Sequence, residues 1–197
     1  MPQARAEELA LLFNQARTHS AWLDRPVDDA VLRQLYELVS TGPTGANSHP
    51  LRLTFVRSAE AKEHLKLALR PLNVEKTMSA PVTAIAAFDV AFYDKMPKLF
   101  PARPELREHL AGLPLEEQTR LALLSTTIQT GYLILAARAL GLDCGPMGGF
   151  DSAKLDELFF PNGDQKSVLL VNLGYGDASK LFPRLPRLDF EEACRII

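Results

Sequence analysis

The chain has 197 residues, of which 47% are hydrophobic and 23% charged, the composition of an ordinary globular protein. Its 22 basic and 24 acidic residues give a formal net charge of −2, so no positive field favours nucleic acid or an anionic membrane as a partner. We expect one domain over residues 1–197. The chain does not open with a basic start and an unbroken apolar run, and polar side chains interrupt its most apolar stretch, 121–142, so we expect a cytoplasmic protein.

Cysteine and histidine give no sign of a disulfide framework or a metal site. Cys144 and Cys194 lie far apart in the chain, and the four histidines fall in four different segments. Neither HExxH nor CxxC spacing occurs. We therefore expect reduced cysteines and no dedicated metal.

The first fifty residues predict two helices and a loop. Apolar residues at helical spacing indicate an amphipathic helix over about 4–17, with Arg17 near its end, and a second helix that Asp28 caps. Residues 41–50 are turn formers and small polar residues, so this loop has accessible backbone amides.

The next segments predict two strands separated by helix. Apolar and polar residues alternate over 51–55, which indicates a half-buried strand. A helix is expected from Ser58 to Leu69, and Pro71 is expected to end it. A short helix around 73–78 and a buried strand over 81–88 follow.

Two long segments follow with opposite character. Residues 92–114 contain prolines among scattered aromatic and charged residues, which is typical of a lid or excursion rather than a core element. Residues 116–140 form the longest helical pattern and are apolar on more than one face, which indicates burial on several sides or against a partner subunit.

The last third predicts a loop, a helix, a strand and an extended tail. Residues 143–150 are interpreted as a glycine loop, after which Asp151 caps a helix to about residue 160. Residues 167–174 are rich in Leu and Val and indicate a buried strand. The proline-spaced tail 180–187 can pack only by lying across a surface, which could belong to another chain.

Familiar catalytic and nucleotide motifs are absent from the sequence. Gly174-Tyr-Gly176 follows a strand and begins like a dinucleotide fingerprint, but Ser179 stands at the third glycine position, and Pro183 and Pro186 prevent the required helix. No GxSxG and no GxxxxGKS/T occurs. A serine hydrolase, a P-loop protein and a Rossmann domain are therefore disfavoured.

Three segments together point elsewhere: Arg17-Thr-His-Ser20, Pro43-Thr-Gly-Ala-Asn-Ser48 and Gly145-Pro-Met-Gly-Gly-Phe-Asp151. With them the chain resembles the FMN-dependent nitroreductase family and, within it, the malonic semialdehyde reductases of the Rut pyrimidine-utilisation pathway. The similarity runs nearly end to end. It includes ARTH, GPTxAN, APVTAI, FYDKMPKLFP, ALGLDxGPMxGFD, GYGDxSKL, PRLPR and FEEAC, where x marks a position outside the match.

The resemblance implies an α+β, nitroreductase-like FMN-binding fold with a central, mostly antiparallel sheet flanked by helices. It also implies an intertwined homodimer with two FMN sites at the interface, with 116–140 as the central interface helix. NADH or NADPH would reduce FMN in a ping-pong reaction. The flavin then carries the hydride chemistry, so no catalytic side chain is nominated.

The resemblance places the FMN phosphate on two arginines, Arg17 and Arg184, whose guanidinium groups suit a dianionic phosphate. Thr18 and His19 match further phosphate or ribityl contacts. The sequence departs from many relatives at Ala21 and Phe182, where those relatives have basic residues, and at Gly148, where many have Glu.

The remaining cofactor contacts implied by the resemblance fall in three segments. The first segment, with Pro43, Thr44, Gly45 and Asn47, would reach the flavin from the partner subunit. The second, with Asn73 and Lys76, would contact the pyrimidine edge of the flavin. The third would point backbone N–H groups at the flavin N5 and consists of Pro146, Met147, Gly148 and Gly149.

The implied acceptor is malonic semialdehyde (3-oxopropanoate), reduced to 3-hydroxypropanoate, and we expect Arg103 or Arg107 to bind its carboxylate from the 92–114 segment. One alternative is a broad-specificity nitro or quinone reductase on the same scaffold. A second is a flavin-binding or storage protein without physiological turnover, which would not lose its flavin absorption rapidly when mixed with NADH.

Overall fold

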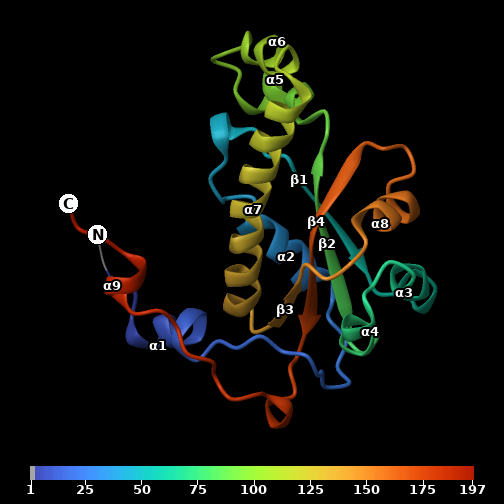
Figure 1. Cartoon of the computed structure of the whole chain (residues 1–197), viewed down its shortest axis with the longest axis vertical. Coiled ribbons are helices and arrows are strands. Elements are labelled where there is room, and N and C mark those ends of the chain that lie inside the picture. Colours follow the sequence, from blue (N-terminus) through green and yellow to red (C-terminus); the bar gives the residue numbers. More distant parts are fainter. Residues whose placement is uncertain (1–2) are drawn as a thin grey trace.

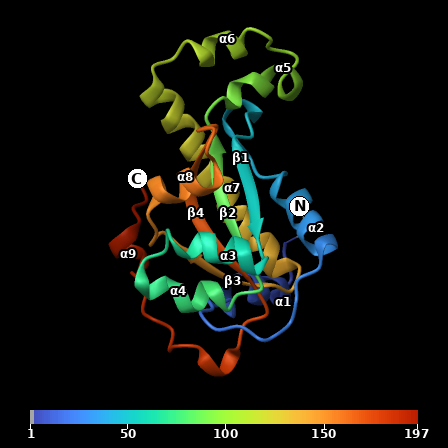
Figure 2. The ribbon, with the colours of Figure 1, turned by 90° about the vertical axis from the view of Figure 1, so that its right-hand side faces the viewer.

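The computed structural model describes residues 3–197, and its centre is a four-stranded sheet in the order β1-β2-β4-β3 (Figures 1 and 2). Each neighbouring pair of strands is antiparallel. The two inner strands are buried on both faces over much of their length, which accounts for their continuous apolar sequence. The strands are β1 (Leu51–Val56), β2 (Val82–Asp89), β3 (Asp143–Met147) and β4 (Gln165–Gly174).

Helices cover both faces of the sheet. In Figure 1, α7 and α2 lie on one face, and α3 and α8 lie on the other. No helix within residues 3–197 is long and apolar enough to cross a membrane. The α-helices are α1 (Ala6–Leu9), α2 (Asp29–Val39), α3 (Ala59–Lys66), α4 (Pro71–Met78), α5 (Met96–Leu99), α6 (Leu106–Ala111), α7 (Leu115–Ala139), α8 (Ser152–Phe159) and α9 (Phe190–Ala193).

The α+β class and the antiparallel sheet predicted from the sequence are confirmed. Two predicted helix caps are also present. The Ser58 side chain accepts a hydrogen bond from the Ala61 amide, and the Asp151 side chain accepts one from the Lys154 amide. Asp28 occupies the N-cap position of α2, but its side chain makes no capping hydrogen bond.

Three predicted element boundaries are wrong. The first helical segment continues from α1 as a π-helical turn over Ala10–Asn14 and ends before Arg17. Pro71 does not stop a helix but begins α4, because a proline at the first helical position loses no hydrogen bond. The predicted glycine loop at 143–150 contains β3, an outer strand where Pro146 needs no second partner strand.

Residues 92–114 project beyond the end of the sheet as a group of short helices, at the top of Figure 1. This excursion has a small apolar cluster of its own, built from Phe92, Met96 and Leu110 with Phe88 and Ala122. The segment is therefore anchored to the start of α7 rather than loose on the surface.

The α7 helix is polar on a buried side and apolar on an exposed side. Its buried polar residues are Ser125, Thr126, Gln129 and Thr130, and its half-exposed apolar residues are Leu123, Leu124, Ile128 and Tyr132. An exposed apolar face on the central helix of a domain is typical of a surface that another chain covers.

The C-terminal segment from residue 181 onward is extended apart from the short helix α9, and it passes α1 without entering the core (Figure 1). Its side chains are mostly exposed, among them Phe182, Leu185, Leu188 and Phe190. The tail therefore packs little against the body of its own chain, and its packing across the surface of another chain stays a prediction.

Candidate functional site

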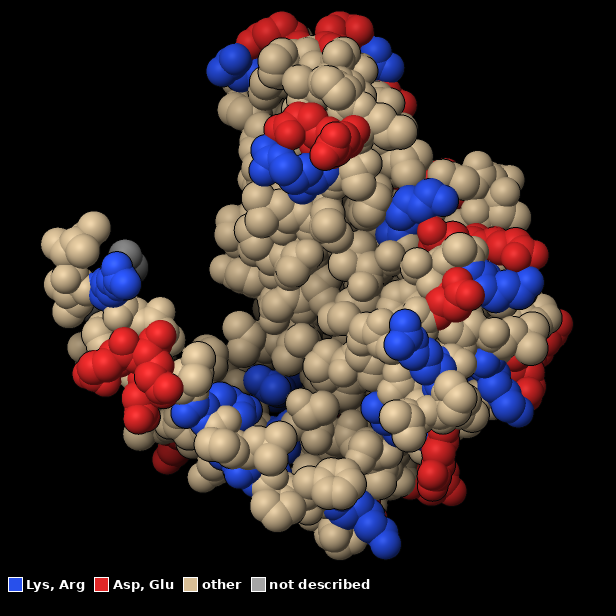
Figure 3. All heavy atoms as spheres, viewed as in Figure 1, with Lys and Arg blue, Asp and Glu red and all other residues tan. Residues whose placement is uncertain are grey.

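The first part of the candidate site is a cavity of about 810 Å³ between the C-terminal segment, residues 13–18 and the last turn of α7. Figure 3 shows basic side chains gathered in the hollow beside the C-terminal segment. Four arginines line it, and none of them forms an ion pair with a carboxylate in the described part of the chain. They are Arg17, Arg138, Arg184 and Arg187.

Neutral carbonyl groups hold two of these arginines in place. The Arg17 guanidinium donates to the carbonyl of Phe182, and Arg184 Nη2 donates to the carbonyls of Asn14 and Ala16 at 2.9 and 3.0 Å. The two arginines thereby join the N-terminal segment to the tail. Because carbonyls carry no net charge, the cavity keeps its positive charge and favours an anion.

His19 lies beside this cavity with its side chain packed inward. Its amide donates to the Cys144 carbonyl at 2.9 Å, and its Nε2 lies 3.3 Å from a carboxylate oxygen of Asp143. Its ring is 6% exposed and fills the space where a side chain at Gly176 would stand. The second glycine of the GYG turn is therefore needed for packing against His19.

The second part of the candidate site is a cavity of about 280 Å³ at the far end of β3. It is lined by Asn73 and Lys76 of α4, by Arg70 and Leu72, and by Pro146, Met147, Gly148 and Gly149. Asn73 Nδ2 donates to the Gly149 carbonyl at 2.6 Å, and a side chain at Gly149 would overlap this amide. A side chain at Gly148 would meet no atom within 4 Å.

A buried polar network fixes the C-terminal end of α4. The Lys76 carbonyl accepts from Trp22 Nε1 at 2.9 Å and from Asn172 Nδ2 at 3.0 Å. Lys62 Nζ donates to the Thr77 and Ala80 carbonyls and to the Thr83 hydroxyl at 2.7 to 3.0 Å. Burial lowers the pKa of Lys62 to about 8. The network holds the helix that presents Lys76 to the cavity.

The strand β3 connects the two cavities. Thr18 pairs with Cys144 near the beginning of β3, and Gly148 follows its last residue. In Figure 1, β3 lies between α1 and α4. The arginine cavity and the Asn73–Lys76 cavity therefore lie along one outer edge of the sheet.

The predicted loop 43–47 lies elsewhere in the single chain. The Gly45 amide donates to the Ser125 hydroxyl at 3.2 Å, and Asn47 Nδ2 donates to the Leu99 carbonyl at 2.8 Å. Ala46, Asn47 and His49 have positive φ values of 43 to 56°, which is strained backbone held by these contacts. One chain does not bring this loop to either cavity.

His49, which is half-buried, extends this loop's hydrogen-bond network to α7. Its Nε2 lies 2.7 Å from Asn47 Oδ1, and its Nδ1 lies 3.2 Å from Gln129 Nε2. Burial and the nearby charge of Arg52 lower the pKa of His49. The neutral ring can donate to Asn47 and accept from Gln129, which keeps the loop on α7.

Arg103 and Arg107 lie on the excursion, and both form ion pairs. Arg103 pairs with Glu105, and Arg107 lies 2.7 Å from both Asp94 and Glu108. Neither arginine lines the two cavities. In one chain they are separated from the other candidate residues.

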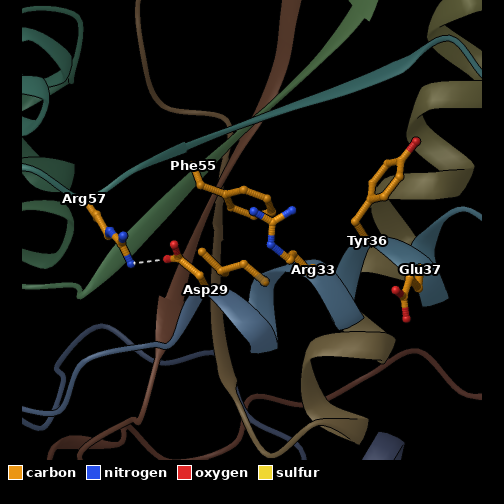
Figure 4. A pocket seen from close by; sticks show the side chains of 7 residues that line it. Asp29, Arg33, Tyr36, Glu37, Phe55 and Arg57 are labelled. Atoms are coloured by element: carbon orange, nitrogen blue, oxygen red, sulfur yellow. Dashed lines mark ion pairs between the residues drawn. The ribbon is translucent and has the colours of Figure 1, made fainter.

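A further cavity of about 550 Å³ lies between α2 and β1 and contains no predicted site residue (Figure 4). Figure 4 shows Arg57 paired with Asp29 at one end and Tyr36 at the other, with Phe55 between them. Within residues 3–197 no cluster of His, Cys, Asp and Glu could hold a metal ion.

Sequence reasoning did not nominate three of the arginines that line these cavities, Arg70, Arg138 and Arg187. Arg138 is 121 positions from Arg17, so no local motif links them. Arg187 lies three residues after Arg184, and this spacing indicates that the two arginines could line the same cavity.

Comparison with known proteins identifies the family. Residues 14–175 match the model of the nitroreductase family, so the chain belongs to it. A protein from Stutzerimonas stutzeri (strain A1501) is 57% identical over 186 residues, 94% of each chain, and one from Ralstonia nicotianae is 52% identical over 200 residues, the full length of both. Both are provisionally named NADH dehydrogenase/NAD(P)H nitroreductase.

Solved structures confirm the fold. A provisionally named nitroreductase from Bacillus subtilis has a TM-score of 0.89 at 19% identity, with 98% of this chain and 100% of that chain covered. Another from Exiguobacterium sibiricum, in complex with FMN, has a TM-score of 0.87 at 17% identity and full coverage of both chains. The fold is thus nitroreductase-like, and proteins of this family bind FMN and use NAD(P)H.

The residues present fit such a cofactor. Four arginines without carboxylate partners suit a phosphate dianion, since each guanidinium offers paired donors. At the other end of β3, Lys76 provides a cation, and Gly148 leaves open space beside the backbone. A cation there suits the negative charge that a reduced flavin ring carries.

Proposed function

We propose that this protein is an FMN-dependent NAD(P)H oxidoreductase that works as a homodimer and reduces malonic semialdehyde to 3-hydroxypropanoate. The observation that carries the proposal is the pair of cavities along β3, one with unpaired arginines and one with Asn73 and Lys76. Bound FMN would supply hydride transfer between NAD(P)H and the acceptor. Supply of NAD(P)H and the unpaired cysteines favour the cytoplasm as the compartment.

The protein's own residues bind and orient the cofactor. Arg17 and Arg184 would hold the phosphate, with Thr18 and His19 beside them. Lys76 would offer its ammonium group to the flavin ring, and the backbone amides of 147–149 would lie against the ring. Asn73 fixes this last segment through the Gly149 carbonyl. Rigid positioning of the ring, rather than a nucleophilic side chain, is what the reaction requires.

The homodimer is supported by two surfaces. The apolar side of α7 is exposed in the single chain, and the 43–47 loop lies away from the cavities. A second copy packed on α7 would cover the apolar residues and could bring its own Pro43, Thr44, Gly45 and Asn47 to the flavin. Each site would then contain residues from both chains.

The acceptor of the proposed reaction is a small carboxylate, so it needs a cation beyond those that hold the cofactor. Arg70 and Lys76 line the smaller cavity without carboxylate partners within residues 3–197, and Lys76 is proposed to face the flavin. Arg103 or Arg107 of the excursion is proposed to bind the acceptor carboxylate in the dimer. Arg103 has one carboxylate partner and Arg107 has two. Arg103 therefore loses fewer ion pairs when it binds a substrate carboxylate.

The decisive experiment is the visible absorption spectrum of the purified protein under anaerobic conditions. We expect flavin bands that disappear on adding NADH or NADPH and return on adding malonic semialdehyde. Return with nitroaromatics or quinones alone would contradict the aldehyde acceptor and favour a broad-specificity reductase, as the names of the relatives suggest. A protein that cannot be loaded with FMN would overturn the proposal.

A further inference from the structure

Arg138 stands in the last turn of α7 and lines both the arginine cavity and the neighbouring cavity beside His19. Its Nη1 donates to the Leu12 carbonyl at 3.0 Å, and its buried Nε has no hydrogen-bond partner. The guanidinium group is therefore held in place at one nitrogen while other donors stay available. It forms no ion pair with any described residue.

The charge arrangement of the large cavity differs from that around the ion-paired arginines of the surface. Arg52, Arg57 and Arg120 each have a carboxylate at 2.5 to 2.6 Å. The arginines that line the large cavity have none, and like charges brought together repel unless an anion joins them. A phosphate monoester carries close to two negative charges and several acceptor oxygens, so more than two guanidinium groups can bind it at once.

We propose that Arg138 is a further phosphate-binding residue, acting with Arg17 and Arg184 on the phosphate monoester of the flavin. This inference rests on the proposed function. Arg187 lines the same cavity, but it donates to the carbonyls of Leu185 and Pro186 in its own tail. Arg138 instead projects from a 25-residue helix, so its position is set independently of the tail.

The competing explanation is purely structural. A cation at the end of α7 complements the helix dipole, and its bond to the Leu12 carbonyl ties α7 to the N-terminal segment. The two roles differ in the ligand that they affect. A phosphate-binding residue stabilises bound FMN but not riboflavin, which lacks the phosphate, whereas a structural residue affects both flavins alike.

The test measures the dissociation constants of FMN and of riboflavin by quenching of flavin fluorescence on flavin-stripped protein. Arg138→Gln keeps a donor for the Leu12 carbonyl and removes the charge. We expect it to weaken FMN about tenfold and riboflavin hardly at all, since a charge-assisted hydrogen bond is of this strength. Arg120→Gln, on the same helix and with the same charge change, should leave both constants unchanged, and Arg17→Gln should weaken FMN alone.

Equal weakening of both flavins by Arg138→Gln, or no weakening of either, would overturn the role of Arg138. If Arg138→Gln proves too unstable to titrate, Arg138→Lys keeps a cation and should retain part of the preference for FMN. Equal weakening of FMN and riboflavin by Arg138→Lys would likewise overturn the role of Arg138. If the unchanged protein binds no FMN, the proposed function fails, and the inference with it. If it binds FMN no more tightly than riboflavin, only the phosphate site, and with it the role of Arg138, is overturned.

Discussion

The side-chain amide of Asn73 donates a 2.6 Å hydrogen bond to the carbonyl of Gly149 and so joins α4 to the segment that follows β3. Both residues were predicted to contact the flavin, and the structure shows that they also contact each other. The position of the segment 147–149 therefore depends on α4. Changes at this contact should affect the stability of the protein before any ligand is bound.

We expect Gly149→Ala to lower the free energy of unfolding by about 1–3 kcal/mol, because the added methyl group overlaps the Asn73 amide. Gly148→Ala is the matched control for stability, since a methyl group there meets no atom within 4 Å. Urea denaturation of the flavin-free proteins measures the free energy of unfolding of both variants. Equal stability of the two variants would show that the segment adjusts without cost.

Lys62 should give the protein a particular pH dependence of stability. Its pKa is about 8 in the folded protein and near 10.5 when unfolded, so between these values the unfolded chain binds more protons. Stability should therefore rise with pH in this range. Between about pH 7.5 and 9.5, the free energy of unfolding of the unchanged protein should rise by about 2 kcal/mol more than that of Lys62→Met.

Urea denaturation at the two pH values measures this gain for the unchanged protein and each variant. Lys66→Met is the control, because Lys66 is exposed and pairs only with Glu63 on the same helix. It should keep the pH dependence of the unchanged protein. A Lys62→Met variant with an unaltered pH dependence would mean that the ammonium group is not destabilised by burial.

The exposed apolar side of α7 should hold the dimer together. Leu124 is 54% exposed in the single chain, and Leu124→Glu would place a charge in the proposed interface. We expect a monomer by light scattering and at least tenfold weaker FMN binding, because each site would lose the partner's loop. Leu67→Glu, at a 65% exposed position after α3, should change neither. A dimer that survives Leu124→Glu would place the interface elsewhere.

The excursion arginines should affect the acceptor more than the cofactor. Arg103→Ala is expected to raise KM for malonic semialdehyde about tenfold or more and to leave FMN binding unchanged, since a carboxylate loses a charged partner. Arg107→Ala should have a smaller effect because two acids already neutralise Arg107. Steady-state kinetics with a neutral nitroaromatic acceptor provides the comparison. Unchanged KM in both variants removes these residues from the substrate site.

Local signals in the sequence predicted most of the fold. Ser58 and Asp151 cap helices as expected, because capping depends on a few neighbouring residues. The strand β3 was missed because glycine and proline within Asp143–Met147 are typical of loops. An outer strand tolerates Pro146, and only the order of the strands in the sheet reveals which strand is outermost.

The candidate site was predicted less completely, for a related reason. Resemblance nominated Arg17, Asn73 and Lys76 one by one, and the structure places them on two cavities that β3 connects. Arg138 had no such signal, because a single arginine in a long helix looks like any surface residue. Its lack of a carboxylate partner is a property of three-dimensional packing, which spacing along the chain does not encode.

Trp22 offers a spectroscopic consequence. It is the chain's single tryptophan, and its indole N–H is bonded to the carbonyl of Lys76 at the end of α4. Its ring also lies close to Gly145 of β3 and Gly174 of β4. The tryptophan fluorescence of the chain therefore comes from one place, beside the proposed flavin site. Its emission can follow cofactor loading and local loosening of α4 in real time, without any added label.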